Sequence, residues 1–107
     1  MRFGKMLNSG DIILANIQFV DTSEIKKRPA LVLFEESGNV IVAGITSNLK
    51  MNGIKLTKKD GAIKDSIIKL NYIFTISEVM IEKKLFALNN LKRKEVYNEL
   101  LNKLNKL

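Results

Sequence analysis

Residues 27–46, KRPALVLFEESGNVIVAGIT, decide the fold of this 107-residue chain. Residues 29–34 (PALVLF) are a short, continuous apolar run rich in strand formers, which predicts a buried strand with its only proline at the first position. Residues 35–39 (EESGN) carry the Gly and Asn of a hairpin turn, and residues 40–45 (VIVAGI) form a second apolar run. The pattern predicts a β-hairpin of two buried strands.

Further strands are predicted on both sides of this hairpin. Residues 11–19 (DIILANIQF) alternate between apolar and polar side chains, which is the periodicity of a strand, and the polar residues 20–27 predict a loop. On the C-terminal side, residues 54–57 are a candidate strand and KKDG at 58–61 is a turn. Residues 66–70 and 73–76 fit two strands or a strand followed by a short helix, and residues 81–88 fit either a strand or a helix.

The C-terminal segment predicts a helix. Tyr97, Leu100, Leu101 and Leu104 recur at helical spacing, and Asn89 or Asn90 can cap the first turn. An isolated helix of this length would be marginally stable, so the apolar stripe is expected to lie on the sheet. The expected fold is α+β, mainly β: one domain over residues 1–107, a small bent antiparallel sheet or barrel with a terminal helix.

Composition excludes several classes of chemistry. The chain has no Cys and no His. Disulfides, thiolate zinc sites, cysteine nucleophiles and imidazole acid–base catalysis are therefore ruled out, together with Ser-His-Asp triads and His-pair ribonucleases. We expect no metal and no cofactor.

The charge is strongly positive and unevenly distributed. Lys and Arg number 18 against 11 Asp and Glu, a net charge of +7, and residues 50–107 hold all of the excess. Such a surface favours polyanions, with nucleic acid first and an anionic membrane second, although a solvated Lys-rich surface has the same signature. No signal peptide or membrane span is evident, so the chain is expected to be cytoplasmic and not bound to a membrane.

Arg28 and Thr46 stand at corresponding ends of the two hairpin strands. With the turn centred near residue 37, residue 28 falls opposite residue 46, and antiparallel partners are about 5 Å apart at Cα. Only three Arg accompany fifteen Lys, so an Arg beside a buried strand suggests a planar, bidentate contact. Two interpretations remain open at this point: a shared ligand, or a purely structural role in which Arg28 pairs with Glu24 or with Thr46.

Several segments resemble one known family, in the right order. The segments are GDIIL at residues 10–14, KRPALVL at 27–33, VAGITSN at 42–48, and DSIIKL at 65–70 followed by IFTI at 73–76. Together they resemble the PemK-like, MazF-like toxins of type II toxin–antitoxin systems. The resemblance spans nearly the whole chain and implies a CcdB/PemK-type, SH3-like antiparallel barrel with a C-terminal helix.

The resemblance also implies a function. Family members are homodimers, and MazF-like members are metal-independent endoribonucleases that cut single-stranded RNA, often mRNA, at short sequences. They leave a 2′,3′-cyclic phosphate and a 5′-hydroxyl. The family's catalytic pair maps onto Arg28 and Thr46, and an antitoxin peptide would occupy the RNA groove.

Further substrate contacts are expected around this pair. Ser47 matches a position that lines the same pocket, and Glu24 is a candidate base if its pKa is raised. The full set of expected substrate-binding residues is Gln18, Glu24, Lys26, Lys27, Ser47, Asn48 and Lys50. Two alternatives to the ribonuclease remain: a non-enzymatic CcdB-like module that inhibits a protein such as DNA gyrase, and a non-toxic RNA-binding relative.

Overall fold

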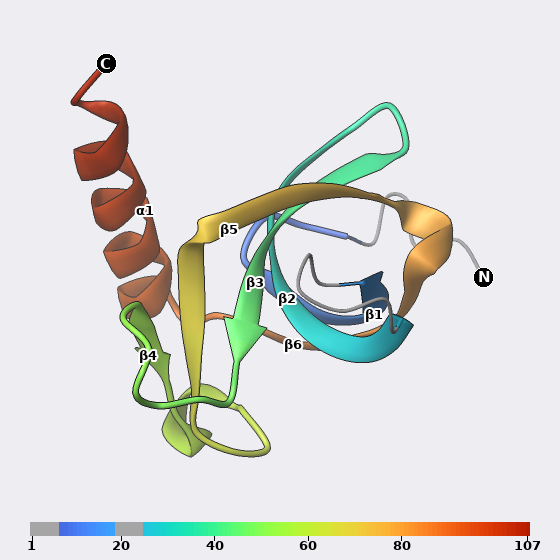
Figure 1. Ribbon diagram of the computed structural model, residues 1–107, viewed down its shortest axis with the longest axis horizontal. Helices are drawn as coiled ribbons and strands as arrows, with labels where there is room; N and C mark the ends of the chain where they lie inside the picture. The colour runs from blue at the N-terminus through green and yellow to red at the C-terminus, as the bar shows by residue number, and fades with distance from the viewer. Residues whose placement is uncertain (1–6, 19–24) are drawn as a thin grey trace.

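The predicted hairpin forms the centre of a six-stranded antiparallel sheet. The computed structural model describes residues 7–18 and 25–107. Its strands lie in the order β4-β5-β3-β2-β1-β6, and the sheet curls on itself (Figure 1). The elements are β1 Asp11–Gln18, β2 Ile25–Glu36, β3 Asn39–Thr46, β4 Ile54–Leu56, β5 Ser66–Ser77, β6 Ile81–Ala87 and α1 Asn90–Leu104, with short 3₁₀ turns at Lys58–Asp60 and Glu78–Met80.

The hairpin turn is tighter than the predicted one. Ser37 and Gly38 both have positive φ, 52° and 82°, as in a two-residue type I′ turn. This turn matches the right-handed twist of the strands, so the ladder continues up to the pair Glu36 and Asn39. A bulge between Val32 and Phe34 changes the register of the ladder, and beyond the bulge Ala30 pairs with Gly44.

The structure corrects the predicted start of β2. Ile25 to Lys27, predicted as the end of a loop, are already in the strand and pair with Gln18 to Asn16 of β1. Pro29 is therefore the fifth residue of β2, opposite Leu14. The ladder with β3 ends at Ala30, so Pro29 stands at an edge on that side, where a strand tolerates a missing amide donor.

Two apolar clusters lie on opposite faces of the curled sheet. The inner cluster fills the curl and includes Ile13, Ala15, Ala30 and Val42, with Phe74 packed against it. The outer cluster fills the space between the sheet and α1; its members include Ile12, Leu31, Ile45, Ile68, Leu88 and Val96. The fold is thus mainly β, a curled antiparallel half-barrel with one C-terminal helix, which confirms the predicted class.

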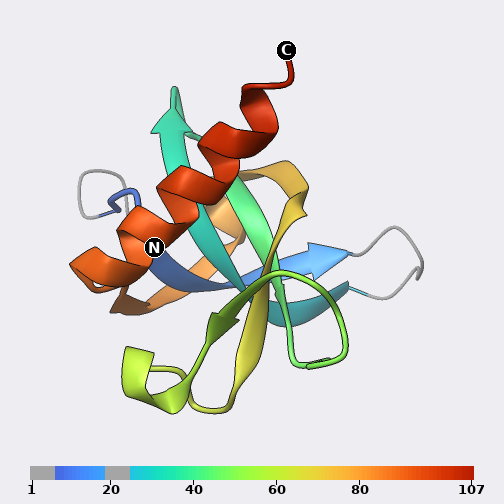
Figure 2. The same cartoon turned by 90° about the vertical axis from the view of Figure 1, so that its left-hand side faces the viewer.

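Helix α1 turns a different face to the sheet from the predicted one. Val96 belongs to the outer cluster, and Leu100 packs against it. Tyr97, Leu101 and Leu104, by contrast, are exposed. The start of the helix sets this rotation, because Arg93 donates hydrogen bonds to the carbonyls of Leu88 (2.9 Å) and Ser9 (2.8 Å). Figure 2 shows α1 lying across one side of the sheet. Among the described residues, no helix is long and apolar enough to cross a bilayer.

Candidate active site

Arg28 is the first polar side chain beyond the inner core on β2. Side chains alternate along a strand, so Arg28 shares a face with Ala30 and Val32, both members of the inner cluster. It pairs with Ala15 of β1, another member of that cluster. Arg28 therefore continues the inner face of the curl at the end of the core, where it is half-buried.

Thr46 occupies the corresponding place on β3. It shares a face with Val42 and Gly44, and it is also half-buried. In the described part of the chain, the last β2–β3 pair is Ala30 with Gly44, so Arg28 and Thr46 lie two residues beyond it on the same face. From there each strand pairs only with its other neighbour, Arg28 with Ala15 and Thr46 with Ile67.

The Thr46 hydroxyl shapes the turn that follows it. Its oxygen accepts the backbone N–H of Asn48 at 3.1 Å, and the Asn48 side chain accepts the N–H of Lys50 at 3.1 Å. Since a hydroxyl both accepts and donates, the Thr46 O–H proton remains available to a ligand. Ser47, Asn48 and Lys50 are exposed beside it.

The other residues that were predicted to bind the substrate lie on both faces of β1 and β2. Lys26 pairs with Ile17 and shares the inner face with Arg28. Lys27 and Gln18 lie on the opposite face, and Lys27 forms an ion pair with Glu82 at 3.0 Å. Lys26 thus shares the face of Arg28, and Ser47, Asn48 and Lys50 follow Thr46 at the end of β3, whereas Lys27 and Gln18 lie on the other face. Glu24 lies outside the described residues.

Lys69 is a basic residue of this face that the sequence analysis did not select. It pairs with Gly44, so it shares the face of Gly44 and Thr46, and it is 6% exposed. Its ammonium donates to the Asn52 carbonyl at 3.0 Å and lies 5.4 Å from the centre of the Tyr72 ring. A lysine inside the apolar run IIKL was the available signal. Only the strand pairing shows that it lies on the same face as Thr46.

Tyr72 of β5 is an exposed aromatic side chain. It is 43% exposed, and its Cβ lies 3.4 Å from the position that a Cβ on Gly44 would take. Phe74 and Phe86, by contrast, pack against the core clusters. The three strands β2, β3 and β5 therefore present a guanidinium, a hydroxyl and an ammonium on one face, beside an exposed aromatic ring. Such a face is suited to a phosphate-containing ligand.

Carboxylates do not gather into a metal-binding group. Within residues 7–18 and 25–107, no three Asp or Glu side chains lie together as candidate ligands. Lys26, Arg28 and Lys69 place cationic donors on the inner face, and such groups suit an anion.

Two comparisons with known proteins show the family of this chain. The family model described as the PemK-like, MazF-like toxin of type II toxin–antitoxin systems matches residues 8–105. The chain is also 33% identical over 104 residues to a protein named endoribonuclease MazF from Staphylococcus saprophyticus, a match that covers 87% of each chain. With a match to nearly its whole length, this chain belongs to the family of PemK-like, MazF-like toxins of type II toxin–antitoxin systems.

Proposed function

We propose that this protein is the toxin of a type II toxin–antitoxin system and cuts single-stranded RNA, mRNA included, at short sequences. Membership of the toxin family and the similarity to an endoribonuclease support the reaction class. The observation that carries the residue assignment is the placement of Arg28 and Thr46 on one face, two residues beyond the last β2–β3 pair.

The proposed reaction uses the 2′-hydroxyl of the RNA as the nucleophile. The 2′-oxygen forms a bond to phosphorus, the bond from phosphorus to the 5′-oxygen breaks, and the products are a 2′,3′-cyclic phosphate and a 5′-hydroxyl. One proton leaves the 2′-oxygen and one is gained by the departing 5′-oxygen. Negative charge accumulates on the phosphate in between, so donors aimed at its oxygens accelerate the reaction.

Arg28 and Thr46 are the proposed donors. The Arg28 guanidinium forms a forked pair of charge-assisted hydrogen bonds with the phosphate, and the Thr46 hydroxyl donates a third. Because the chain has no His, no side chain titrates near neutral pH by default. Proton transfer is therefore expected to limit turnover to a slow rate, which is sufficient for a toxin that acts over hours.

The proposal includes the partners of such a toxin. The protein is expected to form a homodimer, to act in the cytoplasm, and to be neutralised by an antitoxin peptide that covers the RNA site. A polyanionic substrate also agrees with the net charge of +7.

Cleavage of a defined RNA with end mapping tests the reaction. The expected products carry 2′,3′-cyclic phosphate and 5′-hydroxyl ends, and cleavage persists in EDTA. Products with 3′-hydroxyl ends, or a requirement for a divalent metal, would contradict the mechanism. A gyrase supercoiling assay on the same preparation separates a nuclease from a CcdB-like inhibitor.

The variant Arg28→Lys tests the assigned residue. It keeps the charge and loses the fork, so we expect cleavage to slow by about 10²–10³-fold while thermal unfolding is unchanged. Cleavage at the wild-type rate would remove Arg28 from the active site.

A further inference from the structure

Asn48 is held through three polar groups in the turn that follows Thr46. Its backbone N–H donates to the Thr46 hydroxyl oxygen at 3.1 Å. Its side-chain oxygen accepts the backbone N–H of Lys50 at 3.1 Å, and its carbonyl oxygen accepts the N–H of Met51, also at 3.1 Å. The first two bonds form successive turns that are each closed by a polar side chain. Asn48 is therefore fixed through its side chain as well as through its backbone.

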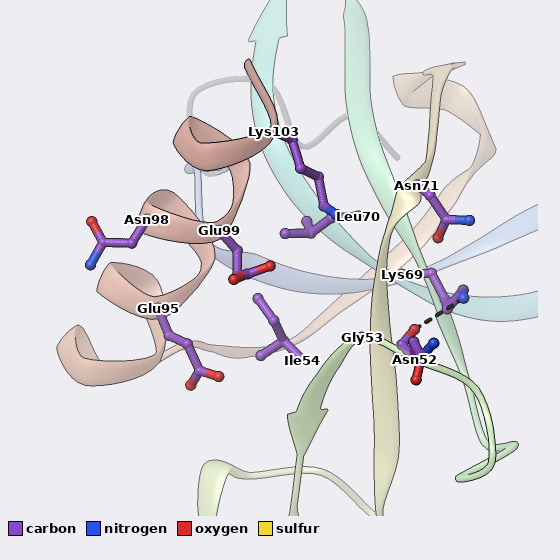
Figure 3. A pocket seen from close by; sticks show the side chains of 10 residues that line it. All are labelled: Asn52, Gly53, Ile54, Lys69, Leu70, Asn71, Glu95, Asn98, Glu99 and Lys103. Atoms are coloured by element: carbon purple, nitrogen blue, oxygen red, sulfur yellow. Dashed lines mark hydrogen bonds between the residues drawn. The ribbon is translucent and has the colours of Figure 1, made fainter. Parts of the chain in front are cut away.

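The loop that contains Asn48 is attached to the sheet at both ends. It begins at Thr46, the last residue of β3. At its other end the Asn52 carbonyl accepts a hydrogen bond from Lys69 at 3.0 Å (Figure 3), and the backbone of Gly53 lies directly against β5. Between these attachments, the hydrogen bonds that the described residues make are all bonds of Asn48. This residue therefore controls the conformation of the loop.

The hydrogen bond from Asn48 orients the Thr46 hydroxyl. Threonine is branched at Cβ, so its side chain has few rotamers, and the N–H of Asn48 holds the hydroxyl oxygen in one place. An oxygen that accepts an N–H on one side directs its own proton away from that donor. A donor that is oriented before the substrate binds stabilises a transition state without first having to reorient.

We propose that Asn48 is a positioning residue that acts on the reaction through the Thr46 hydroxyl. This inference rests on the proposed ribonuclease function, in which that hydroxyl donates to the scissile phosphate. The Asn48 side chain holds the N–H of Lys50 and so closes the second turn, and the closed turn keeps the Asn48 N–H on the Thr46 oxygen. The role differs from the substrate contact that the sequence suggests for Asn48, because it requires no contact with RNA.

The variant Asn48→Ala tests the proposal, because it removes the acceptor of the Lys50 N–H and leaves the backbone unchanged in sequence. We expect single-turnover cleavage at saturating RNA to slow about three- to tenfold, the factor that corresponds to one neutral hydrogen bond. The RNA concentration that gives half the maximal rate should stay the same, since the lost group does not touch the substrate. This split between rate and binding is the first readout.

Two further variants serve as rescue and control. Asn48→Ser keeps a side-chain acceptor that closes the same kind of turn, so it should recover most of the rate. Asn102→Ala makes the same chemical change at an exposed position of α1 and should leave both the rate and the half-saturating RNA concentration unchanged.

A double variant separates positioning from direct contact. In Thr46→Val no hydroxyl remains to be oriented, so adding Asn48→Ala should change the residual rate by less than about twofold. If Asn48 contacted the RNA by itself, the two losses would multiply, because each substitution would remove an independent interaction.

The opposing outcomes are distinct. Losses that multiply in the double variant overturn the inference, and so does a wild-type rate for Asn48→Ala, even with a lower melting temperature, because that result identifies a residue that only stabilises the loop. If the wild-type protein does not cut RNA, the proposed function fails as well. If the wild type cuts RNA and Thr46→Val slows it while Asn48→Ala does not, only the present inference fails.

Discussion

Gly53 allows the loop after Thr46 to lie directly on β5. A Cβ at this position would collide with the Ile68 carbonyl oxygen and with the Ile67 side chain. The backbone of the loop therefore approaches the strand more closely than any other residue would permit, and this approach brings the Asn52 carbonyl to Lys69. One glycine thus positions the side of the proposed active site that β3 and β5 form.

Gly53→Ala should destabilise the protein. The added methyl group meets backbone, which cannot move aside cheaply, so the free energy of unfolding should fall by about 1–3 kcal/mol. Urea unfolding measures the change. Gly38→Ala is the comparison, because Gly38 has a positive φ of 82° but open space around its Cβ position. An equal loss in both variants would mean that backbone conformation, and not the close approach, sets the effect.

Two substitutions of Thr46 test its role in RNA cleavage. Thr46→Val removes the hydroxyl, so cleavage should slow by about 10²-fold or more, in the range for one lost donor to a transition state. Thr46→Ser keeps the hydroxyl and its hydrogen bond from Asn48 and should retain most of the rate. Single-turnover cleavage of RNA provides the measurement. A valine variant with the wild-type rate would exclude Thr46 from the reaction.

At the scale of elements, the beginning of α1 connects the helix to the rest of the fold. The Asn89 side chain accepts the backbone N–H of Lys92 at 2.8 Å, which makes Asn89 the N-cap. Lys92 in turn donates to the Lys55 carbonyl at 2.8 Å and lies 3.9 Å from an Asp60 oxygen. The helix is therefore attached to β4 and the following turn by polar contacts as well as by Val96.

Asn89→Ala should cost about 1 kcal/mol of stability, the usual loss when a helix loses its N-cap. Asn89→Ser keeps a side-chain acceptor and should recover most of that loss. Thermal or urea unfolding compares the two variants. If both were as stable as the wild type, the contacts of Lys92 and Arg93 alone would hold the start of the helix.

Asp60 should make stability depend on pH in the acid range. Its carboxylate accepts the Thr57 backbone N–H at 2.8 Å and the Thr57 hydroxyl at 3.1 Å. These hydrogen bonds, the backbone one first, and the nearby Lys92 hold the pKa of Asp60 below its ordinary value of 3.8. The group therefore contributes stability that is present above pH 3.8 and is lost as the pH falls through the lower pKa of the folded state.

The variant Asp60→Asn tests this contribution. It should be less stable than the wild type at pH 7, and the difference should shrink as the pH falls below about 4. Unfolding in urea at a series of pH values from 3 to 7 measures it. A constant difference across the series would contradict the assigned contribution.

At the scale of the whole molecule, positive charge and the proposed site reinforce each other. The net charge is +7, and residues 50–107 carry 13 basic against 6 acidic side chains. Those residues include β5 with Lys69 and the loop with Lys50, which border Thr46. This charge attracts a flexible polyanion to the surface that carries the proposed site.

RNA binding should weaken steeply with salt. If Arg28, Lys26 and Lys50 each meet a phosphate, about three counterions are released, and the slope of log K against log salt should be near −2. Titration of an RNA oligonucleotide whose 2′-O-methyl groups prevent cleavage, at about 50 to 300 mM salt, measures the slope. An affinity that hardly changes with salt would exclude a phosphate-dominated interface and would favour a protein target.

Much of the fold could be predicted because its signals are local. The hairpin, the capping Asn89 and the alternating strand at residues 11–18 follow from turn chemistry and from periodicity within a few residues. The helix stripe was wrong for a physical reason: apolar spacing shows that a helix has an apolar side, but Arg93 and the outer cluster decide which side turns to the sheet. The early start of β2 depends in the same way on its pairing with β1.

By itself, the sequence determined the class of the fold, the family and the excess of positive charge, because composition, periodicity and ordered motifs are properties of the chain alone. It also predicted residue 28 opposite residue 46, although the β2–β3 ladder ends two residues earlier, at the pair Ala30 and Gly44. Only the tertiary structure decided which charged side chains share a face, moving Lys27 away to Glu82 and bringing Lys69 beside Thr46. That choice depends on bulges and on strand pairings distant in sequence, and a change of one residue in register reverses the face of every side chain that follows.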